Sequence, residues 1–289
     1  MWLRTAAVVL LAAVCCASCS HGPAADARRF QLAGIVTGRE ASPSRVVVAH
    51  EAIEGFMPAM SMAFEVKDEG VSLSAGDRIV ATLVVTDSRS WLENVKVTAV
   101  AGVAAPTVAP RASVTEGAMV PAFQLLDQNE RSITLRDFTG RVLVVTFIYS
   151  RCPLPDFCPL MVKHLEALRR RAREEGFLDR IALLGVTLDP EYDTPAVLRS
   201  YGQSMLAGGD RFDRWTLATG TVRQVEDVAA LFGVGYRLES GGFVTHTLAT
   251  AVIGPDGRIV RVLPSNSWRV DDLVDVVKSR VEPLTGATN

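Results

Sequence analysis

Residues 142–159 read VLVVTFIYSRCPLPDFCP, and this stretch decides the fold of the second part of the chain. Its first eight residues, Val142–Tyr149, form a continuous apolar run that is typical of a fully buried strand. Pro153 and Pro155 keep the following segment out of a helix. Pro159 suits the first helical position, which places Cys158 near the N-cap. The stretch therefore predicts a buried strand, a loop that carries two cysteines, and a helix.

Helices and strands alternate after this stretch. Thr194 is suited to cap a helix, with Pro195 at the first helical position. Residues 254–257 (GPDG) place proline and glycine where a type I turn favours them, so a hairpin is expected there. We expect helices at 160–173, 194–204, 222–232 and 271–281, and strands at 181–188, 248–253 and 258–263. This order predicts an α/β sheet layered by helices.

The N-terminal part has a different pattern. Five short, Val-rich segments alternate between apolar and polar residues, and turn-forming residues separate them. The expected strands are 30–37, 45–50, 60–66, 78–85 and 91–100. Five short strands within about 70 residues predict a small barrel. Residues 102–114 begin with small residues and two prolines, so we interpret them as a linker between two domains.

Composition excludes several classes of protein. The 289 residues are 48% hydrophobic and 21% charged, which is too apolar for a disordered chain. The net charge of −2 gives no sign of a nucleic-acid surface.

The N-terminus has the layout of a secretory signal: one positive charge, an apolar run at 5–17 and then small residues. Residues 1–28 are therefore interpreted as a signal peptide and tether, and the protein as exported to the cell envelope.

Cys19 follows small residues, as the lipidated cysteine does in a bacterial lipoprotein signal, so a lipid anchor at Cys19 is expected, with ordinary cleavage as the alternative. Removal of the leader leaves Cys152 and Cys158 in the folded body. Two thiols at this spacing in an exported protein form a structural disulfide, a redox pair or a metal site. His246 precedes a predicted strand, and it would complete a His-Cys-Cys site suited to copper. Asp189 ends another predicted strand; we interpret it as a turn residue, with support of the site as the alternative.

A second group of candidate ligands lies in the N-terminal part. Met57, Met60 and Met62 fall within six residues, and His50 ends the preceding predicted strand. Met60 and Met62 face the same side of a strand because they are two residues apart. Thioethers and an imidazole select a soft ion such as Cu(I). Packing of the methionines in a barrel core is the alternative.

Several ordered motifs make residues 115–284 resemble the Sco/SenC family. They are VVTFIYSRCP with Cys158-Pro159, GVTLDPEYDTP at 185–195, and His246 before the turn at 254–257. The resemblance implies a thioredoxin-like fold and a copper site made by Cys152, Cys158 and His246. It also implies delivery of copper to, or reduction of the thiols of, the CuA centre of cytochrome c oxidase. The family usually has three residues between its cysteines, whereas this chain has five.

Residues 29–101 resemble the CusF-like periplasmic copper-binding domains, which are five-stranded barrels of the OB type. His50, Met60 and Met62 fall on the ligand pattern of that family. A tryptophan that caps copper in the family is replaced here by Met57, which we expect to act as an extra ligand, with loss of the capping contact as the alternative. The resemblance implies that the first domain is an OB-like barrel that binds copper.

Together these observations predict an exported copper metallochaperone with two domains, an OB-like barrel and a thioredoxin-like domain. One alternative is a thiol-disulfide oxidoreductase, in which Cys152 and Cys158 are the catalytic dithiol. The other is a copper buffer for resistance. The expected partners are the oxidase subunit that carries the CuA site, and other copper carriers or a thiol reductant. No nucleic acid is expected to bind, and membrane contact is expected only through the signal or lipid anchor.

Overall fold

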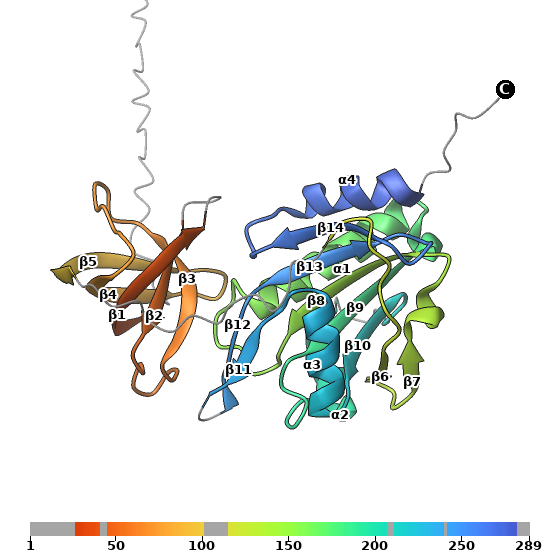
Figure 1. Ribbon diagram of the computed structural model, residues 1–289, viewed down its shortest axis with the longest axis horizontal. Coiled ribbons are helices and arrows are strands. Elements are labelled where there is room, and N and C mark those ends of the chain that lie inside the picture. The colour runs from red at the N-terminus through yellow and green to blue at the C-terminus, as the bar shows by residue number, and fades with distance from the viewer. Residues whose placement is uncertain (1–26, 41–44, 101–114, 207–210, 240–241, 282–289) are drawn as a thin grey trace, which may run out of the picture.

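The computed structural model describes residues 27–40, 45–100, 115–206, 211–239 and 242–281. The predicted signal peptide with Cys19, and the predicted linker at 102–114, lie outside these ranges. Two bodies follow one another along the chain, a smaller barrel and a larger α/β part (Figure 1). Within the described ranges, every helix is too short or too polar to cross a membrane.

The first body is a closed barrel of five strands. They are β1 (Arg28–Glu40), β2 (Arg45–His50), β3 (Met60–Val66), β4 (Asp77–Val85) and β5 (Ser90–Val100), in the order β1-β2-β3-β5-β4. Only the β3–β5 pair is parallel among these pairings. The interior is filled by apolar side chains such as Leu32, Phe64 and Leu92. All five strands predicted from the sequence are present.

A close approach of β1 to β2 depends on a glycine. A Cβ atom at Gly34 would lie 2.6 Å from the carbonyl oxygen of Ala49 and 2.7 Å from the Cα atom of His50. Any larger residue would therefore push β1 away from the end of β2. Gly34 thus fixes the backbone that carries His50.

The second body is built on a seven-stranded sheet in the order β14-β13-β8-β9-β10-β6-β7. The interior strand β8 pairs parallel to β9, and β9 pairs parallel to β10. A separate two-stranded sheet joins β11 to β12. The strands are β6 (Gln124–Asp127), β7 (Ser132–Thr134), β8 (Val142–Ile148), β9 (Ile181–Thr187), β10 (Trp215–Thr219), β11 (Tyr236–Leu238), β12 (Val244–His246), β13 (Ala249–Ile253) and β14 (Ile259–Pro264).

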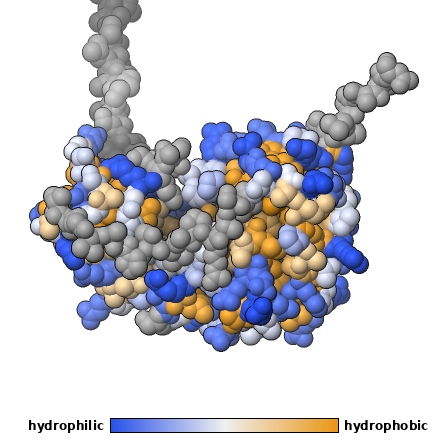
Figure 2. All heavy atoms as spheres, in the orientation of Figure 1, coloured by the Kyte–Doolittle hydropathy of each residue, from blue (hydrophilic) through white to orange (hydrophobic). Residues whose placement is uncertain are grey.

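Helices cover this sheet and leave β8 buried along its whole length. Helices α1 and α4 pack on each other and on β8, and Phe232 at the end of α3 contacts Phe147 of β8. Figure 2 shows hydrophilic residues along the outer side of α4. The helices are α1 (Cys158–Glu174), α2 (Pro195–Met205), α3 (Val222–Leu231) and α4 (Val270–Val281), with short 3-10 helices at Leu135–Phe138 and Leu178–Arg180.

The start of α1 corrects one prediction. Cys158 is the first helical residue, Pro159 is the second, and Phe157 is the N-cap residue. Proline is tolerated there because the first four backbone N–H groups of a helix have no partner within the helix. At α2 the sequence prediction is confirmed, since the Thr194 hydroxyl accepts a hydrogen bond from the Val197 backbone N–H at 3.4 Å.

Candidate metal centres

The dithiol lies beyond the end of strand β8, where the chain leads through a loop into α1. Cys152 is half-buried, Cys158 is fully buried, and both are free thiols. The Cys158 sulfur lies 4.0 Å from Nε2 of His246, at the end of β12. The structure thus brings together the three residues that the sequence singled out. No three histidine, cysteine or acidic side chains already enclose one point in the described part of the chain. At least one of the three side chains therefore has to move before all three can hold one ion.

The His246 ring is set up as a ligand by its own backbone. Its Nδ1 lies 3.0 Å from the carbonyl oxygen of Thr247, which can only accept a hydrogen bond. Nδ1 therefore carries the proton, and Nε2 presents its lone pair toward Cys158. Burial lowers the pKa of His246 to about 4, so the ring is neutral at pH 7. A neutral imidazole is the form that binds a metal ion.

The two thiols ionise unequally. Burial opposes charge on Cys152, but its hydrogen bonds to the Cys158 thiol and to backbone groups of Cys158 and Leu154 lower its pKa below the usual value. Burial, followed by the neighbouring Cys152, raises the pKa of Cys158 well above the usual value. A helix N-terminus favours a thiolate, but desolvation outweighs this effect at Cys158. Cys152 is the thiol that ionises first.

Tyr149 closes one side of the dithiol and was missed by the sequence reasoning. Its ring is buried and meets the His246 ring edge to face, with centroids 6.1 Å apart. Its hydroxyl interacts with Cys152, and burial raises the pKa of this hydroxyl above its usual value. The phenol therefore stays protonated and can donate a hydrogen bond to a Cys152 thiolate.

An ion pair holds the loops around the dithiol together. Arg151 donates from Nε and Nη2 to Oδ2 of Asp189, at 3.0 and 2.6 Å. The same guanidinium lies 4.0 Å from the centroid of the Tyr192 ring. It also lies under Gly242, since a Cβ atom at Gly242 would come within 2.0 Å of it. Asp189 is therefore more than a turn residue, because it anchors the side chain beside Cys152. The signal was its place at the end of β9, next to β8.

His50 and the methionines form a second group inside the barrel. His50 lies directly opposite Met60 in the β2–β3 pair, and Met62 lies opposite Val48. Met57 and Met60 are buried, and Met62 is half-buried. His50 Nδ1 contacts the Glu51 carbonyl oxygen at 2.8 Å, while its buried Nε2 has no hydrogen-bond partner among the described residues. Burial lowers the pKa of His50, so the ring is neutral.

An unpartnered imidazole nitrogen among thioethers fits a soft ion. A buried polar atom without a partner carries a desolvation cost that a ligand would remove. Cu(I) prefers thioether and imidazole donors, whereas oxygen-seeking ions do not. The residues of this group therefore have the chemistry to hold Cu(I).

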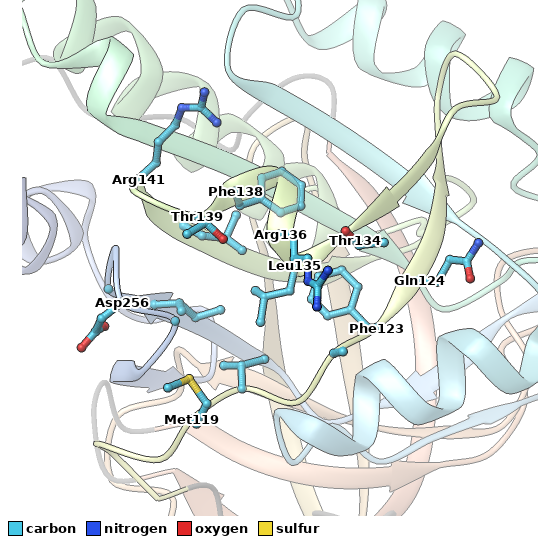
Figure 3. A pocket seen from close by; sticks show the side chains of 16 residues that line it. Met119, Phe123, Gln124, Thr134, Leu135, Arg136, Phe138, Thr139, Arg141 and Asp256 are labelled. Carbon is cyan, nitrogen blue, oxygen red and sulfur yellow. The ribbon is translucent and has the colours of Figure 1, made fainter.

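A separate cavity lies in the second body. Its volume is about 830 Å³, and Figure 3 shows Met119, Phe123 and Leu135 among the side chains around it. Leu143 and Ile253 also line it, and they pair with each other at the start of β8. Cys152 follows the other end of β8. None of the predicted copper ligands lines this cavity.

Comparison with known proteins places the second body in a family. The SCO1/SenC family model matches residues 111–282, so the chain belongs to the SCO1/SenC family. The matched residues do not include the barrel. A SCO2 homologue from mitochondria of Bos taurus is 30% identical over 140 residues, which are 47% of this chain and 50% of that protein. A SCO2-like protein of Rickettsia typhi is 25% identical over 146 residues, 48% of this chain and 67% of that protein. The chain thus spans half of the bovine relative.

Solved structures resemble the same part of the chain. A copper-bound ScoI of Arabidopsis thaliana superposes with a TM-score of 0.50 at 22% identity, and covers 57% of this chain and 98% of its own. A SCO1/SenC family lipoprotein of Bacillus anthracis gives a TM-score of 0.51 at 22% identity, over 57% of this chain and 96% of its own. At this identity the likeness shows the fold alone. The Sco-like thioredoxin fold predicted for this part is confirmed.

Proposed function

We propose that this protein is a copper metallochaperone that holds Cu(I) at Cys152, Cys158 and His246 and delivers it to the CuA centre of cytochrome c oxidase. The observation that carries the proposal is the His246 ring, whose Nε2 lone pair faces the Cys158 sulfur at 4.0 Å. A dithiol that only exchanges disulfides has no need of that imidazole. Copper in the Arabidopsis relative and membership of the SCO1/SenC family support the same metal.

The barrel is proposed as a second Cu(I) site, with His50, Met60 and Met62 as ligands and Met57 as an extra ligand. The buried, unpartnered Nε2 of His50 supports it. The strand order β1-β2-β3-β5-β4 of a closed five-stranded barrel supports an OB-like, CusF-like domain at 29–101. The linker at 102–114 then joins it to the Sco/SenC domain at 115–284.

The leader pattern at 1–19 supports export to the periplasmic side of a membrane, with either cleavage or lipidation at Cys19. In that compartment the partners are the oxidase subunit with the CuA site, and another copper carrier or a thiol reductant.

Reduction of target cysteines is the second candidate function, and the unequal thiols favour it. Cys152 is half-buried with a lowered pKa, whereas Cys158 is buried and protonated. The Cys152 thiolate would attack one sulfur of a target disulfide, and the other target sulfur would leave as a thiol. Cys158 would then attack Cys152, release the second target thiol and leave a Cys152–Cys158 disulfide.

Anaerobic Cu(I) titration of the reduced chain tests the proposal. We expect two equivalents in the parent, one in Cys152→Ser/Cys158→Ser, and one in Met60→Leu/Met62→Leu. Met119→Leu is the matched control, because Met119 is exposed and lies away from both groups. Binding by the methionines alone would contradict the chaperone and favour the reductase. His246→Ala separates the two functions further, since it should abolish CuA assembly but leave disulfide exchange intact.

A further inference from the structure

The loop between the two cysteines packs against the barrel rather than only against its own domain. Leu154 is 0% exposed and Phe157 is 4% exposed, and both belong to the hydrophobic cluster of the barrel. Cys152, Phe243 and Leu248 of the second body pack against the same cluster. The interior of the barrel thus continues into the loop that carries the dithiol.

A buried polar cluster fastens this contact, and we call it the Asp156 latch. It consists of Asp156 and Asn266 from the second body and Arg45 and Ser90 from the barrel. The Ser90 hydroxyl donates to the Asp156 carboxylate at 2.8 Å, and Arg45 Nη2 lies 3.5 Å from the same carboxylate. Asn266 accepts from Arg45 and donates to the backbone oxygen of Asp156. Arg45, Ser90 and Asn266 are all buried.

Separation of the two bodies would leave these groups without partners. The Arg45 guanidinium also lies 5.3 Å from the centroid of the Phe157 ring, so charge and apolar area are buried together. Separation would expose Leu154 and Phe157 on the second body, and it would also expose the apolar surface of the barrel that they cover. The latch therefore holds the docked arrangement.

Docking places the two proposed copper sites next to each other. Strand β3, which carries Met60 and Met62, contacts strand β12, which ends at His246 (Figure 1). Met62 and Cys152 are each half-buried against the same barrel cluster. A methionine of one site and a thiol of the other therefore pack against the same apolar cluster.

We propose that the Cys152–Cys158 loop is a docking element, and that Cu(I) passes across this contact from the His50-methionine site to the dithiol without release to solvent. This inference rests on the two-site proposal above. The five residues between the cysteines, against three in the family pattern, supply Leu154, Asp156 and Phe157 to the contact. Copper stays Cu(I) throughout: bonds to the thiolate sulfurs and to His246 form as bonds to the thioether sulfurs and to His50 break, and the proton of each thiol that binds goes to solvent. Thiolates are the stronger ligands, which sets the direction.

The test follows one equivalent of Cu(I) in the full chain. In the oxidised chain, with a Cys152–Cys158 disulfide, copper can bind only at the barrel. A phosphine reductant then opens the disulfide in the presence of bathocuproine disulfonate, a Cu(I) chelator, at a series of concentrations. The ultraviolet band of Cu(I)–thiolate bonds reports arrival at the dithiol, and the visible band of the chelate reports loss.

We expect the fraction of copper that reaches the dithiol in the parent to stay constant over a 100-fold range of chelator. In Asp156→Ala, this fraction should fall as the chelator increases. Asp227→Ala is the matched control, because Asp227 is 70% exposed in the distant helix α3, and it should behave as the parent. Ser90→Ala is the milder latch variant if Asp156→Ala does not fold, and small-angle X-ray scattering should show an increased radius of gyration in each folded latch variant.

A parent chain that loses copper to the chelator as steeply as the latch variant would overturn the direct transfer while leaving both binding sites in place. Oxidised protein that binds no Cu(I) would overturn the barrel site itself, and with it the transfer.

Discussion

Replacement of Arg151 by methionine tests how the dithiol is held. The methionine side chain would keep the apolar length of the arginine but remove the guanidinium that faces Asp189. The Asp189 side chain is only 3% exposed, so it would remain as a buried carboxylate without its cation. Loss of one partner of a buried ion pair costs about 3–5 kcal/mol. The Arg151 side chain is 32% exposed, so water weakens the pair, and we expect about 2–3 kcal/mol.

Urea unfolding followed by circular dichroism measures this cost in Arg151→Met, Asp189→Asn and the double variant. The double variant removes both charges, so it should recover about 2 kcal/mol relative to the sum of the single changes. Arg223→Met is the control, since the Arg223 side chain is 88% exposed in an ion pair on α3. Its free energy of unfolding should change by less than about 0.5 kcal/mol.

Copper binding gives a second readout of the same change. Arg151 precedes Cys152 and packs under Gly242, which lies in the segment that leads to His246. Loss of such a supporting group lowers metal affinity by about 10–100-fold. A cost below about 1 kcal/mol, together with unchanged Cu(I) affinity, would refute the reasoning that this ion pair organises the site.

Three further predictions concern the same region. Because the folded pKa of His246 is about 4 and the unfolded value is 6.5, the unfolded metal-free chain binds more protons between these pH values. The free energy of unfolding should therefore fall as pH falls through that window, by at most about 2 kcal/mol at pH 5. Urea unfolding should show a weaker pH dependence in His246→Gln than in the parent. Equal pH dependence in the two proteins would contradict the lowered pKa. Gly242→Ala combines a φ of +78° with a Cβ atom 2.0 Å from the Arg151 guanidinium. The free energy of unfolding should therefore fall by about 1–2 kcal/mol. An unchanged urea midpoint would show that the loop relaxes without cost. Iodoacetamide should alkylate Cys152 before Cys158, as mass spectrometry would show, because Cys152 has the lowered pKa and is half-buried; equal rates would contradict the unequal ionisation.

Periodicity and apolar runs predicted the larger elements. Strands 45–50 and 60–66 were predicted with the bounds that the structure has. Each is long enough to show its pattern, and strand β8 is so apolar that only a buried position suits it. The cap at Thr194 was predictable because capping depends on residues next to each other in the sequence.

Other features depend on neighbours that are distant in the sequence. Strands β6, β7 and β10 to β12 have only three to five residues, too few for a pattern to stand out. Arg45 and Asp156 meet across more than a hundred residues, and nothing near either residue indicates its partner. The ionisation order of Cys152 and Cys158 depends on how deeply each sulfur is buried, which spacing does not determine.

The loop between Cys152 and Cys158 joins two proposed copper ligands and also contacts the barrel. Copper binding at the dithiol and docking of the barrel are therefore linked by one coupling free energy. Whatever factor docking of the barrel applies to copper affinity at the dithiol, copper applies to docking by the same factor, because thermodynamic coupling is reciprocal. Delivery of copper to a partner therefore changes the docking equilibrium between the barrel and the second body. A partner that separates the barrel from the second body likewise changes the copper affinity of the dithiol. Release of the copper ion and separation of the two bodies are therefore coupled, and each changes the equilibrium of the other.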